Sequence, residues 1–178
     1  MRRIRTSLFI AAIFVIGISV YIYMNTEGEN EATEQVNVKE LVADYSSNQT
    51  TREAASINSE QLIVKNSNNN ETTYQLPSDE FFVSIAPYVH ATHPCAVHSL
   101  TGCQGELANA SFAIYIEDAE GNTIVDKTIQ SQANGFIDLW LPRNKDYDVT
   151  ISYDGKQTTA SISTFEGDNT CITTMQLA

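Results

Sequence analysis

Short strand-like segments separated by turn residues fill the C-terminal half of the chain, and they constrain its fold more than any other feature. Six such segments lie over 111–117, 123–130, 135–141, 148–153, 157–163 and 171–177. In 148–153, Val149, Ile151 and Tyr153 alternate with polar residues, and the pair Asp154-Gly155 that follows is a strong hairpin signal. A period of two is the side-chain period of a strand with one buried face. The segments therefore predict an antiparallel β-sandwich.

The N-terminal half contains a short helix and further strands. Val38, Leu41, Val42 and Tyr45 lie at i, i+3, i+4 and i+7, which is one face of a helix. A second helical turn is predicted over 52–55, and strands are predicted over 62–64, 72–76 and 80–86. The predicted fold class is mainly β (α+β).

We expect a small helix-plus-strand unit over 36–86, followed by a domain over 87–178. The second domain combines a loop rich in cysteine and histidine with the antiparallel β-sandwich. The order of strands and turns over 112–163 resembles sandwiches of the prealbumin-like or immunoglobulin-like type. A sandwich of this kind hosts many functions, so the fold alone indicates no chemistry.

The N-terminus predicts an extracytoplasmic protein, on the periplasmic or cell-surface side. Arg2, Arg3 and Arg5 precede an uncharged run over 8–24, and such a positive flank stays in the cytoplasm. The run is longer than most signal-peptide cores, and no small-residue cleavage site follows it, so we favour a membrane anchor over a cleaved signal peptide. An acidic linker over 25–35 follows. Residues 25–178 are then placed outside the cytoplasm.

The net charge excludes nucleic acid as a partner. The chain has 22 acidic and 10 basic residues and a formal net charge of −12. Phosphate recognition needs clustered lysine and arginine, which the acidic body lacks. Because 42% of the residues are hydrophobic, most of the chain can bury a core.

Cysteine and histidine residues crowd into one loop. All three histidines and two of the three cysteines fall within residues 90–103, with the spacing H-x2-H-x-C-x2-H-x4-C. They are His90, His93, Cys95, His98 and Cys103. Imidazole and thiolate are ligands that bind copper and zinc. Cys171 is distant in sequence, but it opens the last predicted strand, and a sandwich brings strand ends near connecting loops.

The residues alone leave three kinds of protein open. Three converging thiolates would suit Cu(I), whereas the same ligands would also serve a zinc-binding protein. The spacing lacks the C-x2-C pairs of a zinc finger. The third alternative is a membrane-tethered β-sandwich interaction module in which a Cys95–Cys103 disulfide pins the loop. That alternative would leave Cys171 as an unpaired thiol outside the cell.

The loop and two later segments resemble the CueP family of extracytoplasmic copper-resistance proteins. The shared motif is H-x-C-x2-H-S-x-T-x-C-x-G-E over residues 93–106, with 136–142 and 170–174 as supporting segments. The resemblance covers about 80–177 well and implies copper binding and reduction of Cu(II) to Cu(I). It assigns Cys95, Cys103 and Cys171 as catalytic residues and metal ligands, and matches His93 and His98 to the motif histidines. His90 lies outside the motif.

The resemblance also implies partners. The implied partners are copper ions and an extracytoplasmic copper client protein such as a superoxide dismutase. Whether reduction is catalytic or stoichiometric is left open by the sequence, and a homodimer stays an open alternative.

Overall fold

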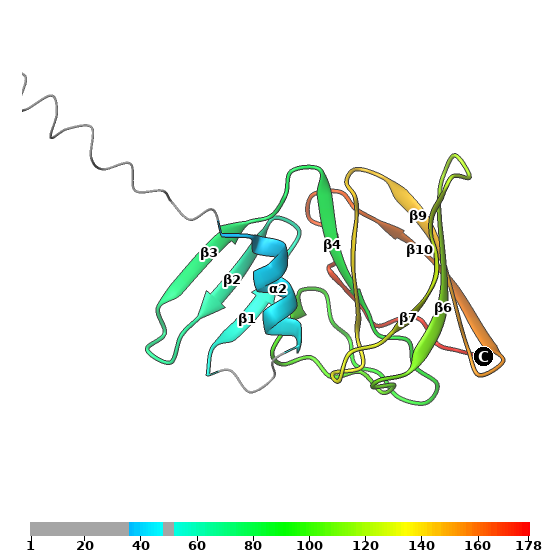
Figure 1. The fold of residues 1–178 in the computed structure, drawn as a ribbon, viewed down its shortest axis with the longest axis horizontal. Helices are drawn as coiled ribbons and strands as arrows, with labels where there is room; N and C mark the ends of the chain where they lie inside the picture. Colours follow the sequence, from blue (N-terminus) through cyan, green and yellow to red (C-terminus); the bar gives the residue numbers. More distant parts are fainter. Residues whose placement is uncertain (1–35, 48–51) are drawn as a thin grey trace, which may run out of the picture. The chain divides into compact units, whose positions relative to one another are not determined.

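The computed structural model describes residues 36–47 and 52–178, and this part of the chain holds one short helix and eleven strands (Figure 1). The helix is α2 (Val38–Ser47). The strands are β1 (Ala54–Ile57), β2 (Gln61–Lys65), β3 (Glu71–Gln75), β4 (Glu80–Ile85), β5 (His98–Ser99), β6 (Ser111–Asp118), β7 (Thr123–Gln130), β8 (Ile137–Pro142), β9 (Asp146–Tyr153), β10 (Lys156–Ser163) and β11 (Cys171–Ile172). The predicted mainly-β fold class is confirmed.

The strands form three sheets with the orders β3-β2-β1-β5, β10-β9-β6-β7 and β11-β4-β8. Every strand pair among the described residues is antiparallel except β11 with β4, which is parallel. The second and third sheets share one hydrophobic core, to which β4, β6, β8 and β9 each contribute alternate residues. These two sheets are the predicted sandwich.

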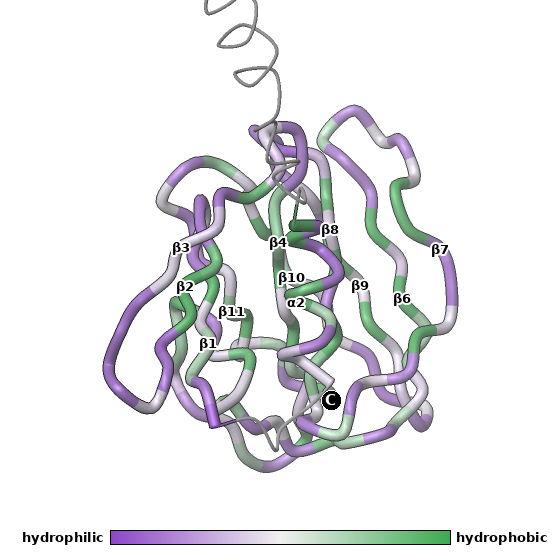
Figure 2. Tube along the Cα trace, turned by 60° about the vertical axis from the view of Figure 1, so that its left-hand side comes forward, coloured by the Kyte–Doolittle hydropathy of each residue, from purple (hydrophilic) through white to green (hydrophobic). Residues whose placement is uncertain are grey.

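Strand β4 is buried on both faces, and this links the sandwich to the N-terminal elements. Phe81 and Val83 belong to the sandwich core, whereas Phe82 points to a second core with Val42 of α2 and Leu62 of β2. The predicted apolar face of α2 packs into this second core. The connection between β2 and β3 is instead hydrophilic, as its run of asparagines requires at the surface (Figure 2).

Three local features differ from the sequence prediction. The helical turn predicted over 52–55 is wrong, because β1 begins at Ala54 and buries Ala55 and Ile57. The two-residue strand β5 was not predicted. The strand predicted over 171–177 extends only over Cys171–Ile172.

The last strand is short because its segment has one residue more than the segment it pairs with. Four residues lead from Ile172 to Gln176, whereas three lead from Ile85 to Tyr88. Ala86 N–H donates to the carbonyl of Ile172, but Tyr88 N–H donates to Met175 rather than to Thr174. The ladder is therefore interrupted before the isolated bridge between Tyr88 and Gln176.

The anchor predicted over 1–24 and the acidic linker predicted over 25–35 lie outside the described residues. Within 36–47 and 52–178, no helix combines the length and the apolar composition needed to cross a bilayer.

Candidate metal centre

Two separate segments of the chain meet at the cysteines. The first is the continuous stretch over 90–103, in which the loop before β5 carries His93 and Cys95, and β5 with its following turn carries His98 and Cys103; the second is β11, which carries Cys171. Ala96 joins the two segments, because its carbonyl accepts the N–H groups of both Thr170 (3.0 Å) and Cys171 (3.2 Å). Parallel pairing of β11 with β4 then fixes Cys171 opposite Ser84.

The ligand atoms of five side chains fall into two groups that share one sulfur. His93, Cys95 and Cys103 form the first group, and the ligand atoms within it lie within 4.8 Å of one another. His98, Cys103 and Cys171 form the second group, whose ligand atoms also lie within 4.8 Å of one another. Two ligands bound to one ion at about 2.3 Å each are at most about 4.6 Å apart, so small shifts suffice to close either group on an ion. His90 is exposed and belongs to neither group.

His98 is the most enclosed of these ligands. Its side chain has no exposed surface, and its ring lies against Phe136 at a centroid distance of 4.5 Å. Its backbone N–H donates to Thr170 Oγ1 (3.1 Å), which fixes the residue beside β11. Neither ring nitrogen finds a hydrogen-bond partner among the described residues. Leaving a buried polar atom unpaired costs about 1–3 kcal/mol, which a bound ion would offset.

Cys103 is held in a tight turn after β5. Its N–H donates to the Ser99 carbonyl (3.0 Å), and the Ser99 N–H points back at the Cys103 sulfur (3.4 Å). The Cys95 and Cys103 sulfurs are 3.7 Å apart, and all three cysteines are free thiols.

The surroundings give the three thiols different acidities. The neighbouring Cys171 thiol, and less strongly the nearby imidazoles of His98 and His93 and the Ser99 N–H, lower the pKa of Cys103 against the effect of burial. The neighbouring Cys103 sulfur, together with burial, raises the pKa of Cys171. Burial also raises the pKa of Cys95. Because the thiolate is the form that binds metal and attacks disulfides, its lowered pKa makes Cys103 the strongest candidate ligand among the three thiols.

Glu106, the last residue of the motif, supports the loop rather than a histidine ring. Its Oε2 accepts the backbone N–H groups of Val89 (2.9 Å), His90 (2.9 Å) and Ala91 (3.1 Å). These hydrogen bonds, that of His90 first, lower the pKa of Glu106. The sequence showed Glu106 as part of the motif, but spacing alone did not indicate that it binds backbone.

Two glycines bring the motif against the β7–β8 connection. Gly105 N–H donates to the Asn134 carbonyl, and a Cβ on Gly135 would lie 2.6 Å from the Gly105 oxygen. Gly135 also has a φ of 80°, a conformation that side chains disfavour. Only glycine fits at this approach, which seats Phe136 next to His98.

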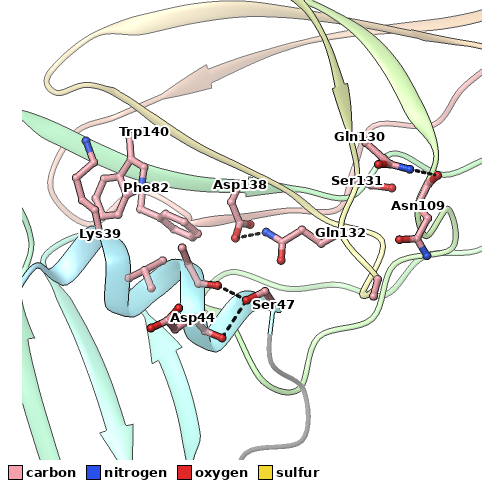
Figure 3. Close-up of a pocket in the computed structure, with 13 residues that line it drawn as sticks. Lys39, Asp44, Ser47, Phe82, Asn109, Gln130, Ser131, Gln132, Asp138 and Trp140 are labelled. Carbon is pink, nitrogen blue, oxygen red and sulfur yellow. Dashed lines mark hydrogen bonds between the residues drawn. The ribbon is translucent and has the colours of Figure 1, made fainter.

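A separate cavity of about 740 Å³ lies between α2 and the β7–β8 connection (Figure 3). Its described lining includes Asp44, Asp138 and Gln132, and Gln132 Nε2 donates to Asp138 (2.8 Å). No cysteine or histidine is among those lining residues, so this cavity is distinct from the metal centre.

Comparison with known proteins gives two matches. The family model described as periplasmic copper-binding protein CueP matches residues 37–176. The solved structure described as the crystal structure of S.CueP is 36% identical, with a TM-score of 0.75 over 88% of this chain and 96% of that chain. A search of curated proteins finds no match.

Proposed function

Because this chain belongs to the CueP family of periplasmic copper-binding proteins, we propose that it holds Cu(I) through the thiolates of Cys95, Cys103 and Cys171. His93 and His98 serve as further ligands. The proposal is carried by one observation: Cys171 of β11 meets the four side chains of the stretch over 93–103, and the five form two groups of closely spaced ligand atoms.

The chemistry of the ligands favours copper in its lower oxidation state. Thiolates are soft ligands that select Cu(I), and Cys103 is shared by both groups. Zinc is the alternative ion, because cysteine and histidine also suit Zn²⁺.

Reduction of Cu(II) follows from the same thiolates. Two thiolates that join as a disulfide release two electrons, which convert two Cu(II) to two Cu(I). Cys95 and Cys103 are the pair we expect to react, since their sulfurs are 3.7 Å apart and Cys95 is partly exposed. Turnover then requires an external thiol donor to regenerate the cysteines.

The copper is passed on outside the cytoplasm. We expect delivery to an extracytoplasmic client such as a superoxide dismutase, which lowers the load of free copper and contributes to copper resistance. The half-exposed His93 and Cys95 provide the side from which a client could take the ion.

Metal analysis after competition tests copper binding. The reduced full chain is exposed to an equimolar mixture of Cu(I) and Zn²⁺ without oxygen, separated from free metal and analysed for both elements. We expect copper to dominate, and a Cys95→Ser/Cys103→Ser/Cys171→Ser variant to lose it. Retention of zinc in excess of copper would favour the alternative ion.

The N-terminal segment keeps the protein at the membrane in this proposal. Arg2, Arg3 and Arg5 before the uncharged run over 8–24 support this arrangement. N-terminal sequencing of the native protein decides it, because a retained anchor gives a start at the beginning of the chain. A mature start near residue 25 would contradict retention without affecting export.

A further inference from the structure

The two ligand groups differ in their access to solvent, although they share Cys103. His93 and Cys95 of the first group are partly exposed, whereas His98 and Cys171 of the second group are 0% and 1% exposed. We name the group His93/Cys95/Cys103 the outer triad and the group His98/Cys103/Cys171 the inner triad. The five ligand atoms do not form one group at this spacing.

The outer triad faces the surface. A shallow hollow of about 340 Å³ is lined by His93 and by neighbours that include Thr92, Gln104 and Glu106. The surrounding loop over 90–97 has no regular structure and most of its residues are exposed. An ion or its carrier can therefore reach His93 and Cys95 without any rearrangement of the sheets.

The inner triad is closed off by apolar groups. Phe136 lies against His98, and Ala86, Phe136, Cys103 and Cys171 form one buried cluster on which Cys95 packs from the outside. Both ring nitrogens of His98 lack a hydrogen-bond partner among the described residues although they are buried. A buried imidazole whose nitrogens have no hydrogen-bond partner, and which lies next to two sulfurs, has the environment of a metal ligand.

We propose that copper occupies two adjacent positions in turn, first the outer triad and then the inner triad, while Cys103 stays bound throughout. The inference rests on the proposed copper function and deepens it by assigning an order to the ligands. His93 and Cys95 leave the ion as His98 and Cys171 bind it, so the ion is never free. The oxidation state remains Cu(I), and the proton that the Cys171 thiol releases on binding is matched by one that Cys95 regains.

Such an arrangement separates access from retention. The outer ligands set how fast copper enters and leaves, since every ion passes them in both directions. The inner ligands set how tightly copper is held, because they surround the resting position and exclude water.

The experiment measures Cu(I) exchange by the full chain, fully reduced and kept free of oxygen. Loading is followed after mixing with the Cu(I) complex of bicinchoninate, and release is followed after adding excess bathocuproine disulfonate. The outer variants are His93→Gln and Cys95→Ser, and the inner variants are His98→Gln and Cys171→Ser. His90→Gln is the matched control, because it makes the same change at an exposed histidine outside both triads.

We expect the outer variants to slow loading and release together by at least about tenfold, and the inner variants to weaken affinity at least about tenfold more than the outer ones do. Cys103→Ser combines both defects, and His90→Gln matches the unmodified chain. Two inner variants are used so that poor folding of one leaves the other to decide.

Equal loss of affinity in outer and inner variants, with no slowing of exchange, would overturn the two-position inference and leave the copper function standing. Failure of the unmodified chain to take Cu(I) from bicinchoninate would instead contradict the proposed function itself.

Discussion

At the scale of single residues, Cys103 and Glu106 belong to one motif but act on different partners. The Cys103 sulfur faces both ligand triads, and its lowered pKa supplies the thiolate on which copper can be bound. Glu106 touches none of these ligand atoms in the described hydrogen bonds, and it holds the backbone that leads to His93. The motif therefore contains both the candidate ligands and a residue that supports the loop carrying them.

Removal of the Glu106 charge should loosen the loop before His93. In Glu106→Gln the neutral amide oxygen accepts the three N–H groups more weakly than the carboxylate does, because hydrogen bonds to charged groups are the stronger ones. We expect faster hydrogen exchange at the amides of His90 and Ala91. Glu117→Gln is the matched control, since Glu117 accepts from the Tyr115 hydroxyl on β6 instead. Unchanged exchange at both amides would show that the carboxylate does not hold the loop.

At the scale of elements, Thr170 joins three segments that the sequence keeps far apart. Its Oγ1 accepts the N–H of His98 (3.1 Å) and donates to the carbonyl of Ile57 (2.6 Å) on β1. The Thr170 side chain is buried, so water cannot replace it as the hydrogen-bond partner of the His98 N–H or the Ile57 carbonyl. The short strands β1, β5 and β11 thus meet at one hydroxyl group.

Loss of this hydroxyl should destabilise the protein. Thr170→Val keeps the shape of the side chain but leaves a buried N–H and a buried carbonyl each short of one partner, which costs about 1–3 kcal/mol of unfolding free energy. Thr170→Ser retains the hydroxyl and should lose much less. Urea unfolding of both variants measures the difference. Equal stability of the two would mean that the hydroxyl is not the link between the segments.

Asp118, in the turn between β6 and β7, should make the free energy of unfolding depend on pH in the acid range. Asp118 accepts hydrogen bonds from Lys145 Nζ (2.9 Å) and from Asn122, and these lower its pKa in the native state. A lowered native pKa gives stability that is present above the unfolded pKa of about 3.9 and is lost as the pH falls toward the native value. In Asp118→Asn this contribution is absent at every pH.

Urea unfolding at a series of pH values tests the acid dependence. The gap in unfolding free energy between the unmodified chain and Asp118→Asn should be largest near neutral pH and shrink below about pH 4. Asp126→Asn, the same change on the exposed face of β7, is the control. A gap that does not change with pH would mean that the Asp118 charge contributes nothing.

Elements with one buried face were the ones that the sequence predicted well. In β6 and β9 the buried residues alternate with exposed ones, which is the pattern that a period of two indicates. Strand β5 has only two residues and is too short to show an alternation. It forms because it pairs with β1, which is distant along the chain. The last strand was predicted too long because a one-residue shift in pairing leaves no trace in hydrophobicity.

At the scale of the whole molecule, the candidate metal centre lies where separate sheets meet. His98 belongs to the sheet of β3, β2, β1 and β5, while Cys171 belongs to the sheet of β11, β4 and β8. Local spacing could indicate that the loop binds metal, since imidazoles and thiols crowd there. It could not show that His98 is buried and His90 exposed, or that Cys103 is shared, because both depend on long-range pairing.

A Cu(II) reduction assay tests whether the cysteine thiolates bind copper and reduce it. The reduced full chain and its single alanine variants receive Cu(II) without oxygen, and a Cu(I)-specific chromophore measures the product. We predict that Cys95→Ala and Cys103→Ala abolish the signal because each removes one thiol of the reacting pair. Cys171→Ala should strongly reduce it because it removes a thiolate that binds the Cu(I) product, whereas His90→Ala should keep most of the signal. Full reducing capacity in all three cysteine variants would contradict the account. A loss in His90→Ala as large as that in Cys95→Ala would instead place the centre at the histidines.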